Sequence, residues 1–421
     1  MILKSAQLLF LVYIVSLPFV QPFHLYIFGM QLQPADIIFV AVLAALAAAV
    51  AFGRLRPVFS RYYIFAAVYW VAFLISTIFS DDRSASSIKL AGVAYLVTIS
   101  IVAMKLAADL EFVRHAIGAF LVGTAVTAIA SVIGAALYYA GYDTPAANFL
   151  LFRFGSLPSG GYPRVNALFT NPNMACNFLN IGAVLTFAAW RLNWIGKLKC
   201  CLLAAVTGLA VLLTISPGIG GVILSLSIWF AVSDQNALSQ GSRRLVLVMG
   251  IFAAVLFLAA ASISLDTENT DVDLVIPVIN VKVEPSVRAV VWAAAFESFV
   301  RHPVTGVGTG IDAFRVRYTV LSGERQLLTE AHNVWLNVAD QAGFVGLIAL
   351  ILFCVYLWSV TQFTVSTDDR QYVTAALSCV FVGGFLYQGL TGSFEDARHL
   401  WVVFGLMAAP LDRGSSETVA G

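Results

Sequence analysis

The stretch TEAHNVWLNVADQAGFVGLIALILFCVYLW, residues 329–358, joins a polar segment to a long apolar one. From Val345 onward almost every side chain is apolar, which is typical of a helix that faces lipid. The residues before it include Glu330, His332 and Asn333. Ionisable groups are rare in membrane helices and usually serve a function there. The entrance to this helix therefore needs an explanation from the rest of the chain.

The apolar character extends over the whole chain. Of its 421 residues, 60% are hydrophobic and 11% are charged, and the mean hydropathy is +0.88. Soluble domains carry about 25% charged residues, and so few polar side chains could not cover the surface of a soluble protein. We therefore predict a polytopic membrane protein surrounded by the lipid bilayer. The net charge of +1, without a basic domain, argues against nucleic acid as a partner.

The five cysteines do not form a recognisable framework. They lie in or beside apolar runs, and no CxxC spacing occurs among them. This pattern indicates buried thiols rather than disulfides or a zinc site. The sequence also has no His/Asp cluster with the spacing of metal ligands, so we expect no metal.

Apolar runs of about 20 residues, the length that crosses a bilayer, recur along the sequence. We expect an all-α transmembrane helix bundle of about twelve spans, forming a single integral membrane domain over residues 1–421. Pro217 and the glycines of SPGIGG separate the seventh span from the eighth, because proline breaks a helix. The predicted spans are 7–28, 35–52, 62–80, 87–107, 113–140, 173–190, 197–215, 218–234, 245–264, 333–360, 372–391 and 397–412.

Lysine and arginine are concentrated in alternate short loops, and loops of this kind stay in the cytoplasm. Both termini are therefore expected to be cytoplasmic. Two longer segments, 141–172 and 265–332, then lie on the outer face, which is the periplasmic side of the inner membrane in a Gram-negative bacterium.

The loop of residues 265–332 begins acidic and becomes rich in arginine. Two explanations remain open. The arginines either form a solvated face, whose ion pairs contribute about 0–1 kcal/mol each, or an anion site, because the guanidinium fork matches phosphate oxygens. The arginines of this loop are at positions 288, 301, 315, 317 and 325.

Within this loop we expect a helix from about Ser286 to Pro303, begun by a serine cap. Arg288 lies in its first turn, next to an apolar stripe at helical spacing. We expect the helix to lie along the membrane surface, although a soluble-style cap over the spans would show the same pattern. The sequence GVGTG at 306–310 lacks the context of a nucleotide-binding loop, so it predicts a tight turn back towards the membrane.

Two neighbouring segments resemble a known family. RHPVTGVGTGIDAF, followed by EAHNVWLNVADQAGFVGLIALI, resembles the hallmark of the O-antigen ligase and polymerase superfamily. Its members share a His-Pro-x-x-Gly-x-Gly-x-x-x-Phe loop and an Ala-His-Asn-x-x-Leu element that opens the next span. Upstream, RVNALFTNPNMACNFL resembles the family's Arg-x-x-Gly-x-Phe-x-x-Pro-Asn segment. The resemblance covers about residues 164–405, and the first 140 residues match only as a hydropathy pattern.

The resemblance implies a metal-independent glycosyltransferase that works on the outer face of the membrane without a cofactor or nucleotide sugar. Such enzymes move a glycan from undecaprenyl diphosphate to an acceptor. In ligases the acceptor is the lipid A-core, and in polymerases it is another lipid-linked oligosaccharide. The sequence leaves these two subclasses open.

Two positions depart from the family pattern. The family commonly carries a Ser-Arg-Gly segment whose arginine is assigned to phosphate binding, whereas this chain has Pro217 at that place, in TISPGIGGVIL. Ala167 likewise stands where glycine is usual. The first departure leaves the anion-binding set one arginine short, unless Arg164 or an arginine of the long loop replaces it.

Transfer from a lipid diphosphate needs a base for the acceptor hydroxyl and cations for the leaving group. His332, with an ordinary pKa of about 6.5, suits the first task, although an interfacial helix cap is the alternative interpretation of this residue. Glu330 is either a second base or a partner that holds His332. We expect Asn333 to cap the helix or to orient His332.

Arginines stabilise charge that develops on a departing diphosphate. Arg288 is the first candidate, because it opens the surface helix, and Arg164, before the Asn-Pro-Asn turn, is the second. Arg315, Arg317 and Arg325 are each interpreted as surface charges, with one of them as a candidate replacement for the missing arginine. Arg398, at the outer start of the last span within an expected interfacial charge belt, is a secondary candidate for the diphosphate, and Asn173 for the acceptor sugar.

A transporter or flippase of an envelope glycan or lipid is the main alternative, since twelve spans and a broken helix at SPGIGG would suit one. Two features argue against a transporter. The halves of the chain show no repeat, and few ionisable groups occupy the predicted span centres. A non-catalytic scaffold is the third interpretation, and it would follow if Pro217 marked a lost site.

Overall fold

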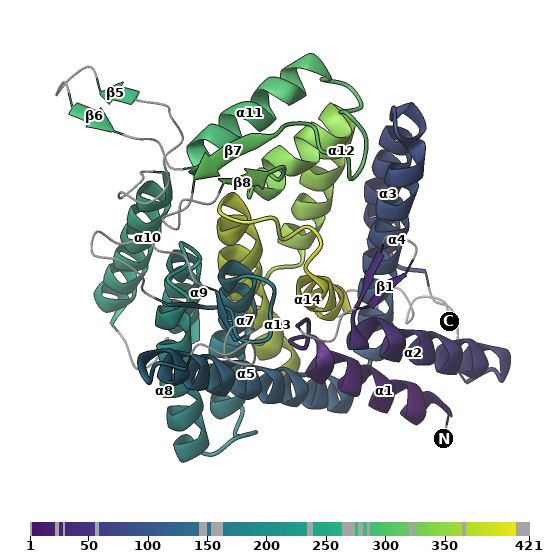
Figure 1. Ribbon diagram of the computed structural model, residues 1–421. Helices are drawn as coiled ribbons and strands as arrows, with labels where there is room; N and C mark the ends of the chain where they lie inside the picture. Colours follow the sequence, from purple (N-terminus) through teal and green to yellow (C-terminus); the bar gives the residue numbers. More distant parts are fainter. Residues whose placement is uncertain are drawn as a thin grey trace.

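The described part of the protein is largely helical (Figure 1), with four short antiparallel hairpins. A computed structural model describes residues 2–21, 25–27, 30–54, 59–142, 150–152, 163–233, 239–262, 274–276, 281–283, 287–319, 325–363 and 368–409. The hairpins pair β1 (Leu25–Ile27) with β2 (Met30–Leu32), β3 (Leu151–Phe152) with β4 (Arg164–Val165), β5 (Leu274–Ile276) with β6 (Val281–Val283), and β7 (Val316–Thr319) with β8 (Arg325–Leu328).

Each predicted span overlaps a helix. The helices are α1 (Ile2–Ser16), α2 (Pro34–Ala51), α3 (Arg61–Phe79), α4 (Arg83–Leu106), α5 (Leu110–Tyr139), α7 (Pro172–Arg191), α8 (Lys197–Leu213), α9 (Ile219–Ser233), α10 (Gln240–Ser262), α11 (Val287–Arg301), α12 (Val334–Ser359), α13 (Asp369–Val380) and α14 (Arg398–Ala408). A π-helix (Phe381–Tyr387) and a short 3₁₀ turn (Gln388–Leu390) continue α13.

Seven helical segments of the described chain are long and apolar enough to cross a membrane, so the count of about twelve spans is not confirmed. The helices α1, α9 and α14 are apolar but shorter than a bilayer span. The first predicted span was too long, since α1 ends at Ser16 and the predicted helix would have contained Pro18. Proline removes a backbone donor and clashes with the preceding turn, so a helix interior excludes it.

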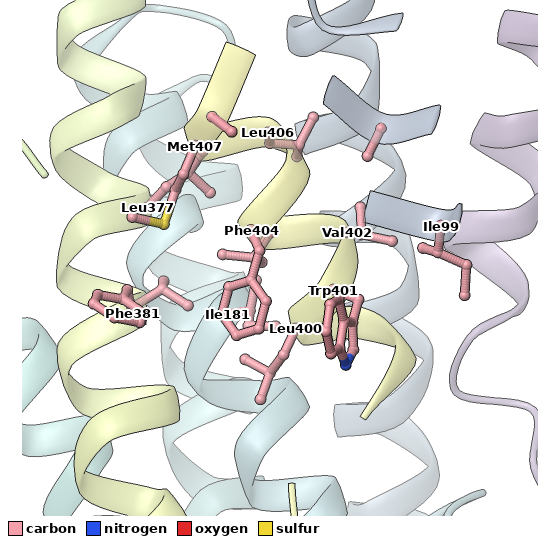
Figure 2. Close-up of a cluster of buried hydrophobic side chains, with 14 of the residues drawn as sticks. Ile99, Ile181, Leu377, Phe381, Leu400, Trp401, Val402, Phe404, Leu406 and Met407 are labelled. Carbon is pink, nitrogen blue, oxygen red and sulfur yellow. The ribbon is translucent and has the colours of Figure 1, made fainter. Parts of the chain in front are cut away.

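The last helix is enclosed by the rest of the bundle. Every residue of α14 from His399 to Ala408 is buried, as expected for a helix that is apolar all round. Figure 2 shows Trp401 and Phe404 of α14 beside Ile181 of α7 and Phe381 of the π-helix.

The expected interfacial charge belt at the start of α14 is only partly exposed, because two of its residues, Glu395 and His399, lie inside the protein, whereas Asp396 does not. Glu395 is 7% exposed and His399 is 3% exposed. His399 Nε2 shares a hydrogen bond of 2.6 Å with Asn177 Oδ1. A buried polar group has to find a partner within the protein, because water is excluded there.

The helix α12 is broken at Gly343, whose backbone angles of φ 60° and ψ −157° are not helical. The break frees backbone groups that would otherwise bond within the helix. Phe344 N–H donates to Pro303 O at 2.7 Å, and Val307 N–H donates to Asp340 O at 3.0 Å. The segment after α11 is thereby fixed to the first turns of α12.

The predicted tight turn at 306–310 is confirmed. All three of its glycines have positive φ angles. The helix predicted between Ser286 and Pro303 is confirmed as α11, which lies beside α12 together with the β7–β8 hairpin (Figure 1). The turn brings the chain from α11 back against the broken end of α12, where the candidate functional residues lie.

Candidate functional site

Two adjoining cavities lie beside the start of α12. We call the first the apolar groove. It has a volume of about 790 Å³, and its lining includes Ile37 and Val40 of α2 and Ile88 and Leu96 of α4. We call the second the polar chamber, with a volume of about 310 Å³. Both cavities are lined by Lys89, Glu330, Gln341, Asp396 and Arg398. The two cavities therefore meet at a charged boundary.

The polar chamber contains four of the eight predicted site residues. Its other lining residues come from the turn before α7, from α12 and from the segment before α14. The predicted residues that line it are Asn173, Glu330, His332 and Arg398. Segments from distant parts of the sequence thus converge on one cavity.

His332 lies directly before the helix cap of α12. Its backbone has φ 48°, a left-handed conformation that is uncommon for a residue with a side chain and occurs often at functional sites. Burial, and then the charges of Arg288 and Arg164, lower the pKa of His332 to about 4. The expectation of an ordinary pKa near 6.5 was therefore wrong, because sequence alone did not reveal the burial or the two nearby guanidinium groups.

Glu330 differs from His332 in its surroundings. Its side chain lines both cavities, where partial desolvation, and then the repulsion of Asp396, raises its pKa against the opposing charge of Lys89. Its hydrogen bond comes from Ser393. Of the two roles left open for Glu330, a separate base on the same chamber fits these contacts better than a partner that holds His332.

Asn333 is the N-cap of α12, as expected. Its side-chain oxygen accepts hydrogen bonds from Trp335 N–H at 3.0 Å and Leu336 N–H at 3.2 Å. Its amide nitrogen donates to Leu390 O at 3.3 Å. These bonds satisfy free amides at the helix start and fix the backbone immediately after His332.

Asn337, one turn further along α12, connects three segments of the site. Its Oδ1 accepts from Ala331 N–H at 2.7 Å, and its Nδ2 donates to Ser393 Oγ at 2.8 Å and to Glu395 Oε1 at 2.9 Å. Burial, and then Asp396, raises the pKa of Glu395. Asn337 was not predicted from the sequence, although its place one helical turn after Asn333 was a usable signal.

Arg164 reaches the turn that carries Pro217 in place of the family arginine. Its Nε donates to Thr214 O at 3.2 Å, and an Nη donates to Asn173 Oδ1 at 3.2 Å. Ser216 Oγ donates to the same Asn173 oxygen at 2.8 Å. A guanidinium group therefore lies beside the turn where the family arginine is absent.

Ala167, the second departure, adopts φ 49° and is fully buried. Glycine adopts such angles without a steric penalty, which accounts for the glycine usual at this place in the family.

Arg398 is held tightly by an acid of α2. Its Nε and Nη2 donate to the two oxygens of Asp36 at 2.8 and 3.0 Å. Tyr95 Oη also donates to Asp36, at 2.6 Å, and the same carboxylate caps α2 by accepting from Gln33 N–H at 2.8 Å. Arg398 therefore lines the chamber with its charge already paired.

The remaining predicted arginines lie outside both cavity linings. Arg288, in the first turn of α11, is half-buried and lies near enough to His332 to lower its pKa. Arg315 is exposed, as is Arg317. Among the predicted cations, Arg164 and Arg288 are thus brought towards His332, whereas Arg315 is not.

Comparison with known proteins identifies one family. Residues 177–351 match the family model described as O-antigen ligase. The matched region runs from α7 into α12 and includes His332 and Arg288, whereas Arg164 lies just upstream. No curated protein matches the chain.

The family match agrees with the resemblance found in the sequence motifs, and the apolar helices agree with a multi-pass membrane protein. Members of this family act in polysaccharide and lipopolysaccharide biosynthesis, and the family implies lipid-linked glycan substrates. Residues 177–351 are thus similar to the O-antigen ligase family, and seven helical segments of the described chain are long and apolar enough for a multi-pass membrane protein.

Proposed function

We propose that this protein transfers a glycan from undecaprenyl diphosphate to an acceptor hydroxyl at the outer face of the inner membrane. The observation that carries the proposal is the apolar groove that shares five lining residues with a polar chamber containing His332 and Glu330. A lipid-linked glycan has the same division, since a long hydrocarbon tail is followed by a charged head and a polar sugar.

The groove suits a hydrocarbon tail because apolar side chains form much of its wall. Ile37 is 59% exposed and Val40 is 67% exposed, and both lie on α2. Exposed aliphatic residues on a membrane helix face lipid. An isoprenoid chain could therefore enter sideways from the bilayer between α2 and α4, with its diphosphate at the charged boundary.

In the proposed reaction the acceptor hydroxyl attacks the anomeric carbon of the donor sugar. The bond from that carbon to the diphosphate oxygen breaks, and undecaprenyl diphosphate leaves with the bonding electrons. His332 accepts the hydroxyl proton, since its depressed pKa keeps it neutral at physiological pH. Arg288 and Arg164 stabilise the charge on the leaving group.

The low pKa makes His332 a weak base before the donor binds. The two arginines that lower this pKa are the residues we propose as diphosphate ligands. A bound diphosphate would offset their positive charge, and the pKa of His332 would rise. The base would then become stronger when the donor is in place.

The other candidate residues have secondary roles. Glu330 is a second proton acceptor on the chamber, and Asn333 fixes the backbone beside His332. Asn173 contacts the acceptor sugar and Arg398 is a paired, fixed cation. Arg315 is exposed and, unlike Arg288 and Arg164, does not contribute to the lowered pKa of His332, so we propose for it a contact with the long glycan rather than with the diphosphate.

The proposal requires the site to face the periplasm. Both termini are then cytoplasmic, and the segments 141–172 and 265–332 are periplasmic loops of one membrane domain. Cysteine scanning with a membrane-impermeant thiol reagent tests this topology. Labelling at position 302 in intact cells is expected, and labelling there only after lysis would reverse the orientation.

Reconstituted transfer tests the function. The purified protein would receive undecaprenyl-diphosphate-linked oligosaccharide with a lipid A-core acceptor, and His332→Ala would be assayed beside it. Glycan on lipid A, absent with the variant, identifies a ligase, whereas lengthened lipid-linked chains identify a polymerase. EDTA should not reduce the rate. No transfer to either acceptor by folded protein would contradict the proposal and favour the transporter alternative.

A further inference from the structure

We propose that Lys89 is a ligand of the carrier diphosphate, and that it reaches the diphosphate by exchanging its ion pair with Asp396 for the bound phosphate. The inference rests on the proposed function and adds to it a residue for which the sequence motifs gave no signal. It also accounts for how a site without the family arginine at Pro217 could bind a multiply charged anion.

Lys89 lies where the two cavities meet. It lines both the apolar groove and the polar chamber, and it forms an ion pair with Asp396. A diphosphate whose tail fills the groove and whose sugar lies in the chamber must cross this boundary. Lys89 is therefore placed at the expected position of the phosphates rather than that of the sugar.

The structure makes space for the lysine side chain. Gly310, with φ 74°, lies against its stem, and a Cβ atom at this position would be 2.7 Å from Lys89 Cβ and 2.9 Å from Lys89 Cγ. The amide of Gly310 is held by Gln341, whose Oε1 accepts its hydrogen bond at 3.0 Å. The last glycine of GVGTG thus leaves space for the stem of Lys89 beside the cavities.

The ion pair of Lys89 with Asp396 is easier to break than that of Arg398 with Asp36. Arg398 donates two hydrogen bonds to Asp36, a carboxylate that is 8% exposed and accepts two further bonds. Asp396, by contrast, has a side chain that is 42% exposed and can be hydrated after Lys89 leaves. A lysine ammonium is a compact charge on a flexible stem, which allows it to change partners.

The ionisation of the acids around Lys89 also affects how a diphosphate could bind there. Glu330, Glu395 and Asp396 line the chamber, so an entering diphosphate meets several acids. Burial, and then Asp396, raises the pKa of Glu395 to about 8, so this carboxyl group adds little negative charge at neutral pH and repels phosphate less. The ammonium of Lys89 would supply direct attraction once Asp396 no longer neutralises it.

Binding measurements on the two partners of the ion pair test the exchange. Affinities of the full-length protein in nanodiscs would be measured for undecaprenyl diphosphate and for undecaprenol. Lys89→Met should weaken diphosphate binding by about ten- to a hundredfold, the effect expected from losing a charged hydrogen bond. Asp396→Asn should strengthen it by about two- to fivefold, because Lys89 would no longer be shared. Neither should change undecaprenol binding.

Opposite effects of the two variants distinguish a ligand from a structural ion pair. Lys105→Met, on the same helix but outside both cavity linings, is the matched control and should bind as the wild type does. Unchanged affinity in Lys89→Met, or weaker binding in Asp396→Asn, would overturn the proposal. If Lys89→Met does not fold, diphosphate binding is measured for Lys89→Arg and Asp396→Asn, since both retain a side chain of similar size. Stronger binding by Asp396→Asn is then the expected result.

The wild-type measurement separates this inference from the proposed function. If the wild type binds undecaprenyl diphosphate no better than undecaprenol, the proposed function itself fails and the role of Lys89 fails with it. If the wild type prefers the diphosphate but Lys89→Met retains the preference, only the role of Lys89 is wrong.

Discussion

Replacing Gly343 with alanine should detach the loop that shapes the site. Gly343 has φ 60° and ψ −157°, a region open almost only to glycine and strained for other residues by about 1–3 kcal/mol. An added Cβ would lie 2.3 Å from Val304 O. The loop would have to move, and two hydrogen bonds would be lost: Phe344 N–H to Pro303 O at 2.7 Å and Val345 N–H to Val304 O at 3.3 Å.

Each lost bond contributes about 0.5–1.5 kcal/mol. Together with the backbone strain, the substitution should therefore weaken the docking of the loop by about 2–6 kcal/mol. Hydrogen exchange measured by mass spectrometry on the peptide 303–311 tests this value. Its amides, including Val307 N–H and Gly308 N–H, should exchange at least about thirtyfold faster in Gly343→Ala. Transfer should also fall, because Gly310 would no longer lie against Lys89.

Gly118→Ala is the matched control, since Gly118 lies within α5 and nothing lies within 4 Å of an added Cβ there. It should leave both the exchange of the loop and the transfer rate unchanged. If Gly343→Ala shows wild-type exchange over 303–311, the break in α12 does not depend on glycine and the explanation of the loop's docking is refuted.

Three further predictions concern the site. Asn337→Leu should destabilise the protein by about 2–4 kcal/mol, because it leaves Ala331 N–H and a buried carboxyl group without their partner; thermal unfolding in detergent measures it, and a wild-type midpoint would contradict it. Asp36→Asn should cost about 3–5 kcal/mol by leaving Arg398 unpaired; the same assay checks it, and a loss below 1 kcal/mol would contradict it. In pH–rate profiles, kcat/KM should fall only as pH approaches 4, since His332 must be neutral in the free enzyme. The fall in kcat should come at a higher pH, because bound diphosphate favours the protonated form of His332. Coincident profiles would count against this coupling.

Hydropathy predicted the helices well because a membrane helix needs a long apolar run whatever surrounds it. The break at SPGIGG is confirmed, since α8 ends at Leu213 and α9 begins at Ile219. The number of spans was less predictable. An apolar run does not show whether its helix crosses the bilayer or, as in α14, is enclosed by other helices.

The motifs predicted the chamber only in part. His332, Glu330, Asn173 and Arg398 come together in it, and of these His332 and Asn173 lie in the two motifs that resemble the family. Lys89 was missed, since a single lysine near the start of a predicted span resembles an ordinary interfacial charge. Its significance depends on α4 packing beside the chamber, which no local pattern in the sequence reveals.

The ionisation of the site could not be predicted from residue types. A histidine at a helix start has an ordinary pKa unless burial and charge change it. Here Arg164 lies far from His332 in the sequence yet contributes to the lowered pKa. Such a long-range contact follows from the packing of the whole bundle rather than from any motif.

The central claim is that the apolar groove and the polar chamber together bind the lipid-linked donor. The most direct measurement is a cryo-electron microscopy structure of His332→Ala in nanodiscs with undecaprenyl-diphosphate-linked oligosaccharide. Isoprenoid density is expected between α2 and α4, with the diphosphate beside Lys89 and the first sugar in the chamber. Donor density elsewhere on the bundle, with groove and chamber empty, would contradict it.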